Sequence, residues 1–88
     1  MSESVSESHV FDVVKRNVME ILEDVDAVLI TREKALKDLG ANSLDRADIV
    51  TGSMEDLGLS FPMRELARVT NIDELVSFLY GRAVGGGQ

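Results

Sequence analysis

Apolar residues recur at spacings of three and four through residues 9–25, which is typical of an amphipathic helix. The stripe consists of Phe11, Val14, Val18, Ile21, Leu22 and Val25. Charged residues such as Lys15, Arg16 and Glu20 lie between them and would face water. The pattern therefore predicts a first helix over residues 9–25 with one face on a core.

The stretch over residues 26–42 has no sustained period and predicts a long connection. Its apolar side chains are candidates for contacts with the core: Val28, Leu29, Ile30, Leu36 and Leu39. Gly40 is where the chain turns most easily with a positive φ, because glycine has no Cβ.

A second helix is predicted to begin at Asn42 and to end near Gly58. Asn42 is a preferred N-cap residue, and Asp45 places a carboxylate in the first turn, where the helix dipole favours it. The apolar positions form two overlapping stripes, Leu44, Ala47, Val50 and Met54 on one side and Ile49, Val50, Ser53 and Leu57 on the other. Periodicity alone leaves open which stripe is buried.

Two further helices have recognisable start signals. Pro62 suits the first position of a short helix over residues 62–68. Asn71 and Glu74 resemble a capping box ahead of a last helix that ends near residue 80. Nothing alternates with a period of two for long enough to predict a sheet. The expected fold class is all-α, a small bundle of three main helices plus one short helix.

The two ends of the chain differ in composition from the middle. Residues 1–7 are rich in Ser and Glu, and residues 81–88 are rich in Gly. Neither segment has enough apolar surface to order itself, so both are expected to be mobile. The folded domain is predicted to span residues 8–80.

The charge of the chain restricts its partners. Its 88 residues include 16 acidic and 9 basic ones, which gives a formal net charge of −7 at pH 7. Such a charge repels phosphate backbones and anionic lipid, so neither nucleic acid nor a membrane is an expected partner. A monomer of this size has no room for a deep enzyme cleft. Proteins with basic patches are the expected partners.

Several kinds of chemistry find no support in the residues. There is no cysteine, which excludes disulfides, thiolate metal sites and cysteine nucleophiles. His9 is the one imidazole, and the acids at positions 23, 24 and 26 lack the spacing of a calcium loop. The first residues do not form a secretory signal, and no apolar run approaches about 20 residues. A cytoplasmic protein without a metal site is expected.

The informative segment is Asp38-Leu39-Gly40-Ala41-Asn42-Ser43-Leu44-Asp45. Ser43 is a hydroxyl at a helix start, where a serine is most often a structural cap. The free N–H groups and the dipole of a helix start also favour a phosphate group. Physical chemistry therefore permits a modified Ser43 without requiring one.

This segment resembles the signature of acyl carrier proteins, in which Asp-Ser-Leu opens the second helix and the serine receives 4'-phosphopantetheine. The Phe61-Pro62 break and the Asn71-Ile72-Asp73-Glu74-Leu75 start of the last helix fall in the family's order, so the resemblance covers about residues 9–80. Asn42 departs from the pattern, because many members have aspartate there. Asparagine retains the capping oxygen and lacks the charge.

The resemblance implies a carrier and not an enzyme. A phosphopantetheinyl transferase using Mg²⁺ and coenzyme A would attach the arm to Ser43, and the thiol of the arm would hold an acyl group as a thioester. The family also implies that Ile49, Val50 and Leu57 face the core. The residues that would meet partners are Leu44, Asp45, Arg46, Ala47, Asp48, Thr51, Met54 and Glu55.

The block Gly-Ala-Asn-Ser-Leu-Asp-Arg-Ala-Asp-Ile-Val over residues 40–50 is similar to the free-standing donor carriers of polyketide β-branching. Those donors imply an acetyl group and an HMG-CoA synthase-like partner. A general fatty-acid or polyketide carrier that serves a ketosynthase or acyltransferase is the alternative. An unmodified acidic helical adaptor is the alternative from another functional class, and a small metal-binding regulator is a third.

Overall fold

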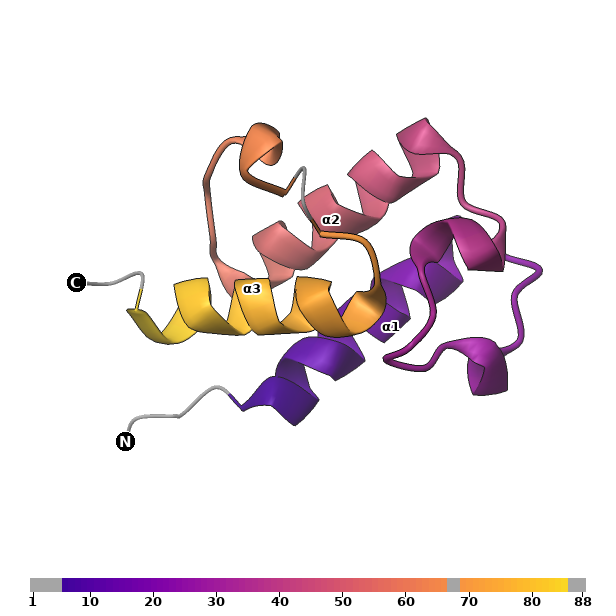
Figure 1. Cartoon of the computed structure of the whole chain (residues 1–88), viewed down its shortest axis with the longest axis horizontal. Coiled ribbons are helices and arrows are strands. Elements are labelled where there is room, and N and C mark those ends of the chain that lie inside the picture. Colours follow the sequence, from indigo (N-terminus) through magenta and orange to yellow (C-terminus); the bar gives the residue numbers. More distant parts are fainter. Residues whose placement is uncertain (1–5, 67–68, 86–88) are drawn as a thin grey trace.

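Three α-helices carry the fold, and short 3-10 turns lie in the connections between them (Figure 1). The computed structural model describes residues 6–66 and 69–85. The helices are α1 (Glu7–Ile21), α2 (Ser43–Leu57) and α3 (Ile72–Gly85), and the turns are η1 (Ala27–Leu29), η2 (Leu36–Leu39) and η3 (Met63–Leu66). Helix α1 packs against both α2 and α3. The described residues contain no strand, and the predicted all-α class with three main helices is confirmed.

Helix α1 begins at Glu7 rather than at residue 9 and ends at Ile21 rather than at residue 25. The Ser6 hydroxyl accepts the His9 N–H at 3.1 Å and caps the first turn. Ser6 and Glu7, predicted to lie in a mobile segment, are therefore the cap and the first helical residue. Leu22 is the C-cap, with its N–H bonded to the Val18 carbonyl at 2.8 Å, and Asp26 caps the next turn, where its carboxylate accepts the Val28 N–H at 3.2 Å.

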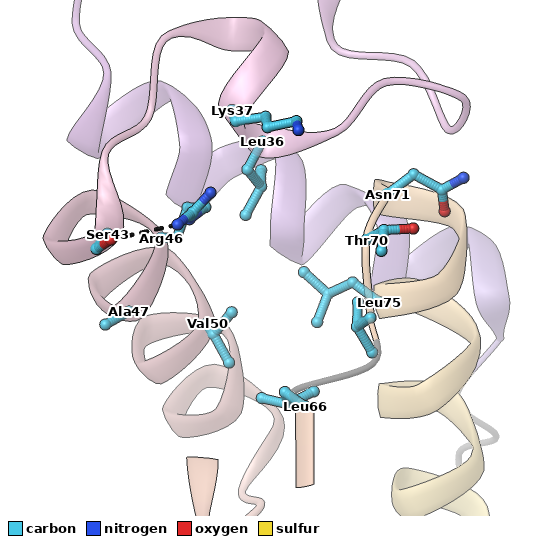
Figure 2. Close-up of a pocket in the computed structure, with 11 residues that line it drawn as sticks. Leu36, Lys37, Ser43, Arg46, Ala47, Val50, Leu66, Thr70, Asn71 and Leu75 are labelled. Carbon is cyan, nitrogen blue, oxygen red and sulfur yellow. Dashed lines mark hydrogen bonds between the residues drawn. The ribbon is translucent and has the colours of Figure 1, made fainter. Parts of the chain in front are cut away.

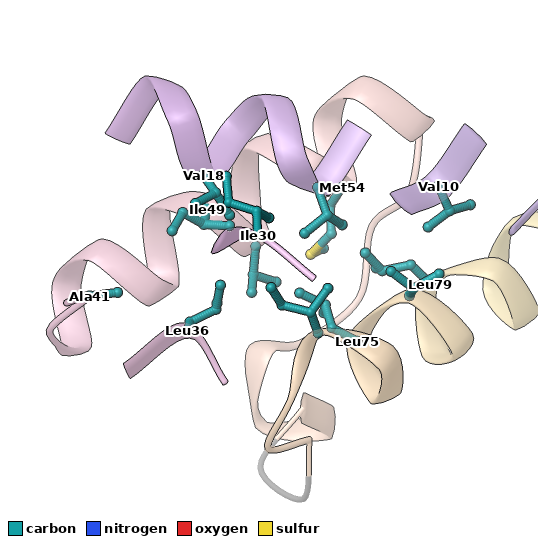
Figure 3. Close-up of a cluster of buried hydrophobic side chains, with 13 residues drawn as sticks. Val10, Val18, Ile30, Leu36, Ala41, Ile49, Met54, Leu75 and Leu79 are labelled. Carbon is teal, nitrogen blue, oxygen red and sulfur yellow. The ribbon is translucent and has the colours of Figure 1, made fainter. Parts of the chain in front are cut away.

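The core is built from one face of each α-helix and from the long connection (Figure 3). Its buried members are Val10, Val14, Val18, Ile30, Leu36, Ala41, Ile49, Val50, Met54, Ile72, Leu75, Val76 and Leu79. Ile30 and Leu36 reach this core from the connection, as predicted. Val28 and Leu29 do not, with 73% and 47% of their surface exposed, because the η1 turn directs only the following Ile30 inward.

Helix α2 presents the predicted face to the core. Ile49 and Val50 are buried, and the half-buried Leu57 packs against the core. A polar contact also joins α2 to α1, since Asn17 Nδ2 donates to the Asp56 carboxylate at 3.0 Å. The adjacent Gly52 has no Cβ, and a Cβ there would lie 2.2 Å from Asn17 Oδ1. Glycine at this position therefore permits the close approach of the two helices.

Two predicted boundaries in the C-terminal part differ in the structure. The short helix expected over 62–68 is the 3-10 turn η3, which Pro62 precedes. Helix α3 continues to Gly85, although the segment from residue 81 was predicted to be a flexible tail. The extra turn is held by Arg82, which pairs with Glu65 and lies 5.0 Å from the centroid of the Phe61 ring. The predictions for 1–5 and 86–88 fall outside the described residues.

The start of α3 is tied to the connection that follows α1. The Ile72 and Asp73 N–H groups donate to the Lys34 and Arg32 carbonyls, each at 2.8 Å. The Arg32 guanidinium also bonds the Asp73 and Glu7 carboxylates, each at 2.8 Å. These contacts fix the first turn of α3 opposite the first turn of α2, where the site lies.

Candidate functional site

Ser43 is the first residue of α2 and is exposed. The turn before it is set by Gly40, whose φ of 95° lies in the left-handed region. Asn42 then caps the helix, because its Oδ1 accepts the Asp45 N–H at 2.8 Å while the Asp45 carboxylate accepts the Asn42 N–H at 3.3 Å. The predicted cap is confirmed, and it leaves the Ser43 hydroxyl free of a capping role.

Arg46 lies one helical turn after Ser43 and places a cation beside the serine hydroxyl. Its Nη2 donates to Ser43 Oγ at 3.3 Å. The cation and the positive end of the α2 dipole act in the same direction, since both favour an anion attached at Ser43. Sequence reasoning had assigned Arg46 to partners only. Its spacing of three residues from Ser43 is the signal that would have placed the two side chains together.

A cavity of about 460 Å³ opens beside Ser43 (Figure 2). It is lined by Leu36, Lys37, Ser43, Arg46, Ala47, Val50, Leu66, Val69, Thr70, Asn71 and Leu75. In Figure 2, Ser43 and Arg46 lie on the α2 side, and Thr70 and Asn71 lie on the α3 side. The wall contributed by Leu66, Val69, Thr70 and Asn71 was not predicted, because these residues have no periodic pattern and gain a common surface only through the fold.

The α3 side of the cavity carries a compact capping network. The Asn71 Oδ1 accepts the Glu74 N–H at 2.8 Å, as the predicted cap requires. The Glu74 carboxylate accepts from the backbone N–H and the hydroxyl of Thr70, at 2.8 and 2.9 Å. These bonds, the backbone one first, lower the pKa of Glu74 below its usual value. The Glu74 carboxylate thereby orders the chain at the edge of the cavity.

The predicted partner-facing residues of α2 fall into three groups. Leu44, Asp48, Thr51 and Glu55 are exposed. Asp45, Arg46 and Ala47 are partly exposed. The assignment of Met54 to the exposed face was wrong, because Met54 is only 8% exposed and belongs to the core (Figure 3). It lies four residues after Val50 and so shares the buried stripe. We call the remaining seven residues the α2 partner surface.

His9 is exposed. Across the described part of the chain, no group of three or more His, Cys, Asp or Glu side chains is arranged to hold a metal ion. Within residues 6–66 and 69–85, no helix has both the length and the apolar character needed to cross a membrane.

Comparison with known proteins adds independent information. The family model described as the phosphopantetheine attachment site matches residues 12–79. The chain is 40% identical over 78 residues to the polyketide biosynthesis acyl-carrier-protein AcpK of Bacillus subtilis (strain 168), covering 89% of this chain and 95% of that relative. It is 33% identical over 76 residues to the mitochondrial acyl carrier protein of Dictyostelium discoideum, covering 86% of this chain and 62% of that protein. No solved structure matched the chain.

Proposed function

The chain belongs to the acyl carrier proteins, which hold acyl groups on 4'-phosphopantetheine and are carriers rather than enzymes, and we propose that this group is attached to Ser43. The observation that carries the proposal is the exposed Ser43 hydroxyl at the capped start of α2, inside the matched region and beside a cavity lined in part by apolar side chains. Family members act with a phosphopantetheinyl transferase and with biosynthetic enzymes such as ketosynthases.

The residues around Ser43 fit a phosphodiester. The hydroxyl is accessible to a transferase, and Asn42 rather than Ser43 caps the helix, so modification removes no capping bond. A negative charge on Ser43 would lie beside the Arg46 guanidinium and the N-terminus of α2. Arg46 would thereby hold the base of the arm near the cavity. When bound, the group supplies a thiol that carries the acyl chain as a thioester.

We propose further that the acyl group is acetyl and that the carrier donates it to an HMG-CoA synthase-like enzyme for polyketide β-branching, in the cytoplasm. The similarity of residues 40–50 to donor carriers supports this role. The 40% identity to a carrier named for polyketide biosynthesis supports the polyketide setting. The chain's own part is to present the acetyl group and to select the enzyme, while the enzyme supplies the base and the stabilising environment.

The transfer assay follows the acetyl group between two carriers. The acetyl-loaded protein is mixed with such a synthase and with an acceptor carrier loaded with an acetoacetyl group. We expect intact-mass measurement to show that the acceptor carrier gains one acetate unit, which is the transferred acetyl group together with the water that the reaction consumes. The donor carrier returns to its free thiol form. Absence of transfer, together with efficient elongation of the loaded protein by a fatty-acid ketosynthase, would contradict the donor role.

The size of the cavity favours a second candidate function, a general fatty-acid or polyketide carrier. A cavity of about 460 Å³ lined by Leu36, Val50, Leu66 and Leu75 offers more apolar surface than a two-carbon group can cover. Longer chains would gain about 0.8 kcal/mol for each buried methylene. This alternative predicts that loading with an eight-carbon chain strongly raises the free energy of unfolding of the carrier, whereas loading with acetyl does not.

Exposed acids on the α2 partner surface are expected to promote recognition by the transferase. Reversing two exposed acids, in Asp48→Lys with Glu55→Lys, should lower kcat/KM for pantetheinylation by about tenfold, because exposed charges guide association with a basic partner. Added salt should reduce the difference from wild type. The matched control is Asp12→Lys with Glu20→Lys, which makes the same charge change on the exposed face of α1. Equal loss in both variants would show that only net charge matters.

A further inference from the structure

A second hollow, of about 670 Å³, lies between the end of α1, η1 and η2. We call it the loop groove, lined by residues 21–26, Leu29, Lys34 and 38–40. Turn η2 separates it from the cavity beside Ser43, since Leu36 and Lys37 line that cavity while Asp38 and Leu39 line the groove. The groove therefore adjoins the segment that leads into Ser43 without including the α2 partner surface.

Part of the lining of the loop groove is apolar. Leu22, Val25 and Leu39 are partly buried and pack against the core, which accounts for their presence. Leu29 is different, because it is 47% exposed and follows Val28, which is 73% exposed. Packing against the core therefore does not explain why Leu29 lines the groove. Exposed apolar residues next to a hollow are a feature of protein interaction surfaces.

The rim of the loop groove is strongly acidic. It carries Glu23, Asp24, Asp26 and Asp38 against the single cation Lys34. Asp26 and Asp38 are engaged locally, where they accept the Val28 and Ala35 N–H groups.

The other two rim acids are available to a partner. In the part of the chain that the structure describes, Glu23 and Asp24 form neither an ion pair nor a side-chain hydrogen bond, and both are exposed. Apolar lining residues together with these two carboxylates complement a partner segment with one apolar side chain flanked by lysine or arginine.

We infer that the loop groove is a second docking site for the condensing synthase, separate from the α2 partner surface. A basic segment of that enzyme would seat an apolar side chain against Leu29 and pair its cations with Glu23 and Asp24. The identity of the enzyme rests on the proposed function. A second copy of this chain is a poor occupant, because each copy carries a net charge of −7.

The position of the groove explains why the same enzyme would use it. Gly40 lines the groove and Ser43 lies three residues further along the chain, at the neighbouring cavity. An enzyme that docks around Ser43 to receive the acyl group from the arm would therefore lie next to the groove. Two separate contacts would favour this synthase over enzymes that bind the α2 partner surface alone, because the loss of either contact lowers the affinity independently.

The test measures the dissociation constant of the pantetheinylated full-length protein for the purified synthase. Glu23→Lys with Asp24→Lys should weaken binding by at least about tenfold, whereas the control Asp12→Lys with Glu20→Lys has the same net charge and should change it by less than about threefold. Leu29→Ala should weaken binding by on the order of fivefold, and Met19→Ala, which is similarly exposed, should not. Circular dichroism checks that each variant is folded. If the variant Glu23→Lys with Asp24→Lys is not folded, Glu23→Gln with Asp24→Asn takes its place.

The outcomes separate the groove from the proposed function. If the synthase binds the wild-type protein, and binds the groove variants as tightly as the control variants, only the groove proposal is overturned. A wild-type protein that does not bind the synthase would overturn both the partner assignment and the groove. Selective loss in the groove variants, with the Asp48 and Glu55 contacts intact, would support two docking sites on one carrier.

Discussion

Replacing Ser43 with alanine is expected to abolish attachment of phosphopantetheine completely. In the proposed modification the Ser43 side-chain oxygen forms the bond to phosphorus, and alanine offers no such atom. The protein is incubated with coenzyme A, Mg²⁺ and a promiscuous phosphopantetheinyl transferase, and its intact mass is then measured. The Ser43→Ala protein should show no gain in mass. The control Ser77→Ala removes an exposed hydroxyl from α3 and should be modified as fully as wild type.

The Ser43→Ala protein should remain folded, which separates a chemical role from a structural one. Asn42 caps α2, and the bond from Arg46 to Ser43 is exposed, so the free energy of unfolding should change by no more than about 0.5 kcal/mol. An alanine protein that still gains the arm would place it on another residue. A protein that unfolds would instead give Ser43 a structural role that its exposure does not explain.

Replacing Ile49 with alanine should have the largest effect on stability among single changes in α2. Ile49 is fully buried, and such truncations cost about 2–5 kcal/mol because transfer energy is lost and a cavity remains. A domain of this size has a total stability of about 4–13 kcal/mol. A loss of about 3 kcal/mol would lower the melting temperature by roughly 12–24 °C.

The control for Ile49→Ala is Leu44→Ala in the same helix. Leu44 is 70% exposed, so its truncation should change the free energy of unfolding by no more than about 0.5 kcal/mol. Urea unfolding followed by circular dichroism measures both. Equal destabilisation by the two variants would contradict the orientation of α2, and with it the placement of Ser43 and the α2 partner surface.

The sequence predicted the features that depend on local chemistry. The Asn42 and Asn71 caps, the turn at Gly40 and the end of α2 before Gly58 all follow from side chains within a few residues of one another. These local signals were enough to predict the all-α class and the position of Ser43 at the start of α2.

Other features depend on contacts between distant segments, and the sequence did not predict them. Periodicity left the two apolar stripes of α2 open, and the family resemblance placed Met54 outward. The assignment was wrong because the packing of the other helices buries Met54. The extension of α3 depends on Arg82 meeting Glu65 and Phe61. The cavity wall and the loop groove likewise form only when separate turns come together.

The most direct test of the central claim is to locate the modification in the wild-type protein. After incubation with coenzyme A and the transferase, tandem mass spectrometry of proteolytic fragments identifies the modified residue. We expect one phosphopantetheine per chain, on Ser43. An unmodified chain, or a phosphopantetheine on any other residue, would contradict it.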